Sequence, residues 1–145
     1  MKKISTRKAT ELYNGLFDID VTIMDKLTLA VLEFEEELKE KVIRNYNLKL
    51  SKINKKHCSV DEQNNFFLDT QNNPIFTKFT KEAWELREVD ITLLYAEEVD
   101  VEGSICTDLS RVKKLSPSIL KTYNGLLFNI DMESFIQEPK TDEKN

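Results

Sequence analysis

The chain has 145 residues, of which 40% are hydrophobic and 32% charged, and its formal net charge is −5. This length predicts one domain that is long enough to bury a hydrophobic core, and the composition is that of an ordinary soluble protein. No apolar run approaches the roughly 20 residues of a transmembrane helix and no signal-peptide core follows Met1, so we expect no membrane partner. The two cysteines, Cys58 and Cys106, belong to no motif, which favours a reduced, cytoplasmic chain.

The first twenty residues are predicted to contain a short edge strand, residues 2–4, and then a short helix. Ser5 or Thr6 can cap that helix, which runs to Asn14, and Gly15 stands where a left-handed residue would end it. We expect the apolar residues of this segment to pack on the helix that follows: Leu12, Tyr13, Leu16 and Phe17.

The clearest signal in the chain is a long amphipathic helix from Thr22 to Tyr46. Thr22 and Asp25 have the spacing of a capping box, which marks its start. Apolar residues recur every three or four positions, so they fall on one helical face: Met24, Leu27, Val31, Phe34, Leu38, Val42 and Tyr46. The steps drift towards four, which favours a core helix over a coiled-coil seam.

The opposite face of this helix carries acid–base pairs four residues apart, with the acid on the N-terminal side, which is the favourable orientation. These pairs are Glu35–Lys39, Glu37–Lys41 and Glu40–Arg44. Leu50 and Ile53 keep the helical phase, so we extend the predicted helix to about Lys55.

The middle of the chain is predicted to supply the strands. Residues 66–68 and 74–76 flank a turn-rich segment, which is typical of a β-hairpin. Thr80 can cap a short helix to Arg87, and apolar residues then alternate with polar ones from Val89 to Tyr95, which predicts a strand. The acidic run up to Gly103 would be a turn, and residues 104–107 a return strand.

Ser116 and Pro117 mark the start of a last helix, because a capping hydroxyl precedes a proline at the first helical position. We expect residues 137–145 to form a disordered tail. The prediction is therefore one α+β domain over residues 1–136, with a long central amphipathic helix packed with shorter terminal helices and a small antiparallel sheet. A short echo, YNGLFDID at 13–20 and YNGLLFNID at 123–131, reflects either shared helix-end chemistry or matching roles of the two terminal helices.

Charge is segregated along the chain. No acidic residue lies between Lys41 and Val60. In the segment 97–102, by contrast, four of the six residues are acidic and none is basic. The basic candidates for partner binding are Lys41, Arg44, Lys49, Lys52, Lys55 and Lys56, and the acidic candidates are Glu97, Glu98, Asp100 and Glu102. Both segments can be solvated faces that keep the protein soluble, or one of them can face a partner of opposite charge.

The residues give no pattern for catalysis or metal binding. His57 and Cys58 are adjacent, but zinc needs four ligands or three with a water, and only Cys106 and scattered carboxylates remain to supply them. The acids near residue 100 do not have EF-hand spacing. We therefore predict no catalytic residue, no cofactor and no metal ligand.

The order of the segments resembles that of small proteins of unknown function encoded in tailed-bacteriophage genomes. The resemblance lies in TKEAWELREVDI at Thr80–Ile91 and LSPSILKTYNGLLFNI at Leu115–Ile130, arranged around the helix at Leu27–Arg44. It implies a phage-encoded accessory, virion or assembly protein, or a factor that acts on the host. It implies no catalytic residue.

We predict a non-enzymatic protein–protein interaction protein, a phage virion or assembly component located in the virion or in the cytoplasm of an infected host cell. Its partners would be virion proteins or further copies of itself. The alternative is a phage counter-defence inhibitor of a host enzyme or nucleic-acid-binding complex, in which residues 97–102 mimic phosphates. A direct nucleic-acid contact through residues 41–56 is a third hypothesis, which the acidic net charge disfavours.

Overall fold

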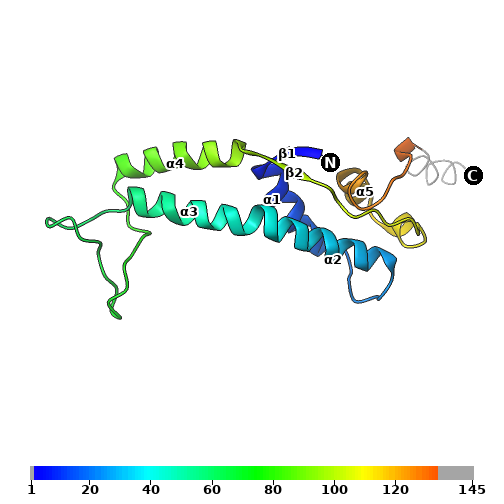
Figure 1. Cartoon of the computed structure of the whole chain (residues 1–145), viewed down its shortest axis with the longest axis horizontal. Helices are drawn as coiled ribbons and strands as arrows, with labels where there is room; N and C mark the ends of the chain where they lie inside the picture. Colours follow the sequence, from blue (N-terminus) through cyan, green and yellow to red (C-terminus); the bar gives the residue numbers. More distant parts are fainter. Residues whose placement is uncertain (1, 134–145) are drawn as a thin grey trace, which may run out of the picture.

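A computed structural model describes residues 2–133 and confirms the predicted α+β class. The described chain is elongated (Figure 1). The predicted tail, residues 137–145, lies outside the described residues. The elements in chain order are β1 (Lys2–Ser5), α1 (Thr6–Gly15), η1 (Leu16–Asp18), α2 (Lys26–Leu38), η2 (Lys39–Ile43), α3 (Arg44–His57), α4 (Lys81–Ala96), β2 (Glu98–Val101), η3 (Val112–Lys114) and α5 (Pro117–Tyr123).

The long helix is confirmed; it begins four residues later than predicted and ends at His57, close to the predicted end at about Lys55. It is helical from Lys26 to His57 through α2, the π-helical η2 and α3, which corresponds to roughly 48 Å of rise. The first half packs in the core, whereas the second half leaves it, as Figure 1 shows. All three predicted acid–base pairs form, with N–O distances of 3.1, 2.9 and 3.1 Å.

The start of this helix differs from the prediction. Asp25 is the N-cap and accepts a hydrogen bond from the Thr28 amide at 2.9 Å. Thr22 instead donates from its backbone and its hydroxyl to Asp20, at 2.8 and 2.6 Å. An Asp cap is at least as favourable as a Thr cap, so the helix begins later and Met24 is left exposed, outside the buried stripe.

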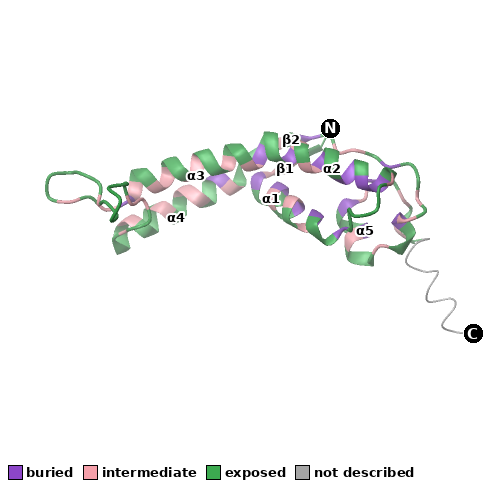
Figure 2. Cartoon of the chain, turned by 90° about the horizontal axis from the view of Figure 1, so that it is seen from below, coloured by how far each residue is buried: buried purple, intermediate pink, exposed green. Residues whose placement is uncertain are grey.

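The core lies in a part that we call the body, residues 2–43 and 97–133. Figure 2 shows the buried residues gathered there, on α1, α2, α5 and the chain that follows β2. The predicted stripe is buried at Leu27, Val31, Phe34, Leu38 and Val42. A bidentate ion pair joins the start of α2 to the segment before η3: the Arg111 guanidinium binds the Asp25 carboxylate at 2.7 and 2.9 Å.

The two echo segments meet in the body. The buried Tyr123 hydroxyl donates to the Leu12 carbonyl at 2.7 Å. Gly15 lies beside that hydroxyl, and a Cβ on Gly15 would stand 2.5 Å from it. Gly15 is right-handed, with φ −70°, so the prediction of a left-handed helix end was wrong there; close packing explains this glycine. Gly125, at the corresponding position of the second echo segment, is left-handed, with φ +86°.

The sheet consists of β1 and β2, which pair antiparallel from Lys2 opposite Val101 to Ser5 opposite Glu98. The predicted edge strand at residues 2–4 is thus confirmed. The predicted strand at 89–95 is wrong, because α4 is one helix from Lys81 to Ala96. Thr80 caps α4, and no glycine or proline interrupts the segment before its end. The acidic run is β2 rather than a turn, and residues 104–107 form no strand.

A second part, residues 44–96, projects from the body, and we call it the arm. It consists of α3, α4 and the connection 58–80, with the two helices side by side in both views (Figures 1 and 2). The predicted turn is present and is closed by an isolated antiparallel bridge between Leu68 and Pro74, but residues 66–68 and 74–76 do not form the two predicted strands. An equivalent turn precedes it, and both turns have the sequence D-x-Q-N-N: Asp61 and Asp69 each accept two backbone hydrogen bonds.

Candidate protein-binding surface

Polar contacts hold the two helices of the arm together. The hydroxyls of Tyr46 and Tyr95 lie 2.8 Å apart, and Arg87 Nε donates to Asn54 Oδ1 at 2.7 Å. Of the residues in α3 and α4, all of which the structure describes, only Leu94 is buried. Most helix pairs are stabilised by burying an apolar face. The contact between α3 and α4 therefore buries little apolar surface, and most of the apolar surface of the arm faces solvent.

Two sites in the arm have perturbed pKa values. The hydrogen bond from His57, at 2.6 Å, lowers the pKa of the Asp90 carboxyl, and Lys56 at 3.2 Å adds to the effect. Burial and the hydrogen bond to Tyr95 raise the pKa of the Tyr46 hydroxyl to about 12. Both shifts follow from contacts between α3 and α4, so the ionisation of these groups is linked to the packing of α4 on α3.

Most of the predicted basic residues contact other residues of the chain itself. Lys41 binds Glu37 at 2.9 Å, Arg44 binds Glu40 at 3.1 Å and Lys49 binds Glu97 at 2.6 Å. Lys56 binds Asp90, and Lys55 lies over the Phe76 ring, 5.1 Å from its centroid. Within the described part of the chain, Lys52 has no ion-pair partner.

The predicted acidic segment runs beside this basic helix, and within the described residues Glu97 is its one side chain that forms an ion pair with it. Glu97 belongs to the ion pair with Lys49, and Lys3 is opposite Asp100 in the sheet. Glu98 and Asp100 point outward from β2, whereas the backbone amide of Glu102 is bound by Glu37 at 2.7 Å. The two charged segments are thus far apart in sequence and adjacent in space, and each compensates part of the charge of the other.

Sequence reasoning missed the most distinctive surface of the arm, an apolar row on α4. Leu86, Val89 and Leu93 are 59%, 57% and 64% exposed, although they are large and apolar. Their spacing of three and four residues places them on one helical face. That spacing was visible in the sequence, but it was obscured by further apolar residues on the face that contacts α3.

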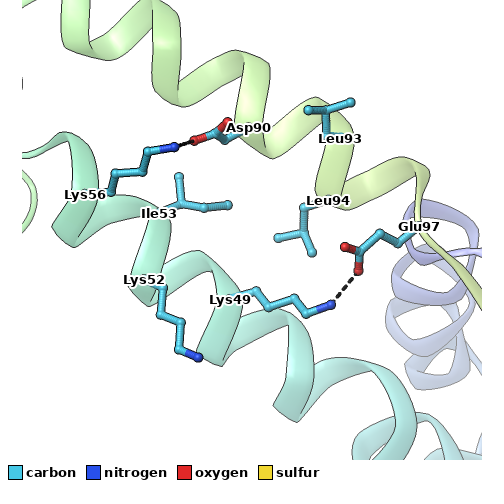
Figure 3. A pocket seen from close by; sticks show the side chains of 8 residues that line it. All are labelled: Lys49, Lys52, Ile53, Lys56, Asp90, Leu93, Leu94 and Glu97. Carbon is cyan, nitrogen blue, oxygen red and sulfur yellow. Dashed lines mark hydrogen bonds and ion pairs between the residues drawn. The ribbon is translucent and has the colours of Figure 1, made fainter.

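A groove lies between α3 and α4, and Leu93 is the one member of this row that lines it. It has a volume of about 340 Å³ and is lined by Lys49, Lys52, Ile53, Lys56, Asp90, Leu93, Leu94 and Glu97. Figure 3 shows Ile53 and Leu94 pointing into the space between the helices, with ion pairs at both ends of the groove. The floor is thus apolar, the α3 edge carries three lysines and the α4 edge carries Asp90 and Glu97.

The remaining candidates have local roles. Cys58 donates from its thiol to the Lys55 carbonyl, and Cys106 donates to the Asp108 carbonyl. Across residues 2–133, no three His, Cys, Asp or Glu side chains are grouped so that they could hold a metal ion. None of the described helices is both long enough and apolar enough to span a membrane.

No protein-family model, curated protein or solved structure matches this chain.

Proposed function

We propose that this protein is a non-enzymatic protein–protein interaction component, and that the arm is the part that binds another protein. The observation that carries the proposal is the exposed row Leu86, Val89 and Leu93 on a helix whose other apolar face is already packed on α3. Contiguous exposed apolar surface beside charged residues is typical of protein-binding sites. An arm that extends from a well-packed body can present this surface without disturbing the fold.

The biological setting that we propose is a phage virion or its assembly. Its support is the resemblance of the segment order to that of small tailed-bacteriophage proteins, together with a shape in which one part is a compact body and the other an extended arm. Counter-defence inhibition through residues 97–102 stays a prediction, but Glu97 is engaged by Lys49, which disfavours phosphate mimicry by that side chain. The nucleic-acid contact also stays a prediction.

Site-specific photocrosslinking tests the proposal in the cells that produce the protein. A photoreactive amino acid at Leu86 on the arm is compared with the same amino acid at Met24, an apolar position on the body that is also exposed. We expect a discrete crosslinked product with a different protein from Leu86 and none from Met24. The absence of a product from Leu86, or equal products from both positions, would contradict the proposal.

A further inference from the structure

We propose that the apolar row on α4 binds an apolar surface of the partner protein that is bordered by arginine or lysine. One of these basic side chains lies in a hollow beside the row, with its charge on Glu88. The inference rests on the proposed function and specifies the chemistry of the partner. It concerns the side of the row that faces away from the groove.

The hollow has a volume of about 270 Å³ and is lined by Glu88, Val89, Thr92 and Leu93. Val89 and Leu93 are exposed and form its apolar wall. The Thr92 hydroxyl donates to the backbone carbonyl of Glu88 at 2.9 Å, so the Glu88 carboxylate is the one charged group of the lining. An apolar wall that ends at a carboxylate suits lysine or arginine, because the apolar stem of these side chains packs on such a wall while the charged end stays in water.

Acidic side chains border the row on the side of the hollow. Glu85, Glu88 and Thr92 recur at spacings of three and four residues, so they form a second line beside the apolar row. Glu88 pairs with its sequence neighbour Arg87 at 3.0 Å, and its side chain is exposed. Within the described part of the chain, Glu82 and Glu85 form no ion pair. Exposed pairs contribute little, so Glu88 can turn to an incoming cation at small cost.

On the groove side of the row, the acids are already compensated by α3. Asp90 binds Lys56 and His57, and Glu97 binds Lys49. The acids of this surface that lack a partner on another helix are therefore those beside the hollow. A partner with basic residues at that border is attracted, whereas one with acids there is repelled.

A second copy of this chain offers the two halves of this chemistry on different helices. Another α4 has the apolar row, but its acids would meet the acids of the first, because the basic residues of α4 are Lys81 at its start and Arg87, which contacts α3. Another α3, laid antiparallel, can bring the three groove lysines level with these acids. In α3, all of which is described, Leu48 is the one large apolar residue that is exposed, so the apolar row would face lysines. A different protein that carries both features on one surface is the better fit.

Synthetic helical peptides test this chemistry on the full chain. Two fluorescent peptides share one leucine stripe and differ only in the residues along one border of the stripe, which are arginine in one and glutamate in the other. By fluorescence anisotropy at low salt, we expect the arginine peptide to bind at least about fivefold more tightly, because exposed ion pairs with Glu85 and Glu88 add to the apolar contact.

Two variants locate the contact. Val89→Asp should abolish most of the binding, and because Val89 lines the hollow but not the groove, this loss assigns the binding to the row. Glu88→Lys should remove most of the preference for arginine. The matched control is Glu36→Lys, at an exposed acid of α2 in the body, which should leave the preference unchanged. Circular dichroism verifies that each variant is folded.

The possible failures are distinguishable. Equal binding of the two peptides, binding of neither, or an unchanged preference in Glu88→Lys would overturn the inference, even if Leu86 crosslinks to another protein and the proposed function stands. Light scattering that shows a dimer of the wild type, dissociated by Val89→Asp, would identify a second copy as the occupant and also overturn it. A lack of crosslinks from Leu86 would contradict the proposed function itself, whatever the peptides do.

Discussion

Replacement of Leu94 by alanine should loosen the arm and leave the body intact. Leu94 is the single buried residue of α3 and α4, so its removal takes away the centre of the contact between them. Buried Leu→Ala substitutions cost about 2–5 kcal/mol. We expect the lower end, about 2 kcal/mol, because Leu94 lines an open groove that water can enter. The matched control is Leu38→Ala, a buried leucine of α2 in the body.

Hydrogen exchange read out segment by segment measures this effect. Because a tenfold change corresponds to about 1.4 kcal/mol, amides of α3 and α4 should exchange about 30-fold faster in Leu94→Ala, with α1 and α5 unchanged. Leu38→Ala should instead accelerate exchange in the body. If Leu94→Ala accelerated exchange equally throughout the chain, the arm and the body would be one cooperative unit, and the assignment of a separately opening arm would be refuted.

Three further results are expected. Gly15→Ala should destabilise the wild type in urea unfolding, because its Cβ would meet the Tyr123 hydroxyl at 2.5 Å; in a Tyr123→Phe background the nearest remaining atom is 3.6 Å away, so the same change should be neutral or stabilise by up to about 1 kcal/mol. Arg111→Ala should lower the urea midpoint at pH 7. The Arg111 hydrogen bonds hold the pKa of Asp25 well below its ordinary 3.8, so this stabilisation is present above pH 3.8, and the difference from wild type should shrink as pH falls below that value. Tyr46 has a pKa raised to about 12 in the folded chain, so its contribution is present below pH 10 and is lost as pH rises from 10 to 12; Tyr46→Phe should reduce this alkaline loosening of the arm in hydrogen exchange.

The sequence predicted the long helix well because its determinants are local. The buried stripe from Leu27 to Val42 and the three acid–base pairs depend only on residues within one or two turns of each other. The caps at Thr80 and Ser116 were identified for the same reason, and Ser5 was one of two candidates for the first cap. The cap at Asp25 was missed because two capping residues compete within four positions, and Arg111, which holds Asp25, is 86 residues away.

The charged segments could be located in the sequence, but their relation to each other could not. Residues 41–60 and 97–102 looked like two independent surfaces because each is of nearly uniform sign. The return of the chain through α4 brings Glu97 to Lys49 and the Asp100 carbonyl to Lys41, at 2.6 and 3.4 Å. Only the tertiary arrangement determines which basic residues remain available, and Lys52 is the clearest of them.

The mispredicted strand and the candidate surface have the same cause. Between Trp84 and Tyr95 apolar residues occupy two faces of the helix, and this density produces an apparent period of two from Val89 onward. A helix with apolar residues on two faces is normally buried on both. In this chain α3 covers the face that contains Leu94, and the face that contains Leu86 and Leu93 is left to solvent. The departure from the expected pattern therefore identifies the residues that a partner would cover, and this makes the arm the first place to test for function.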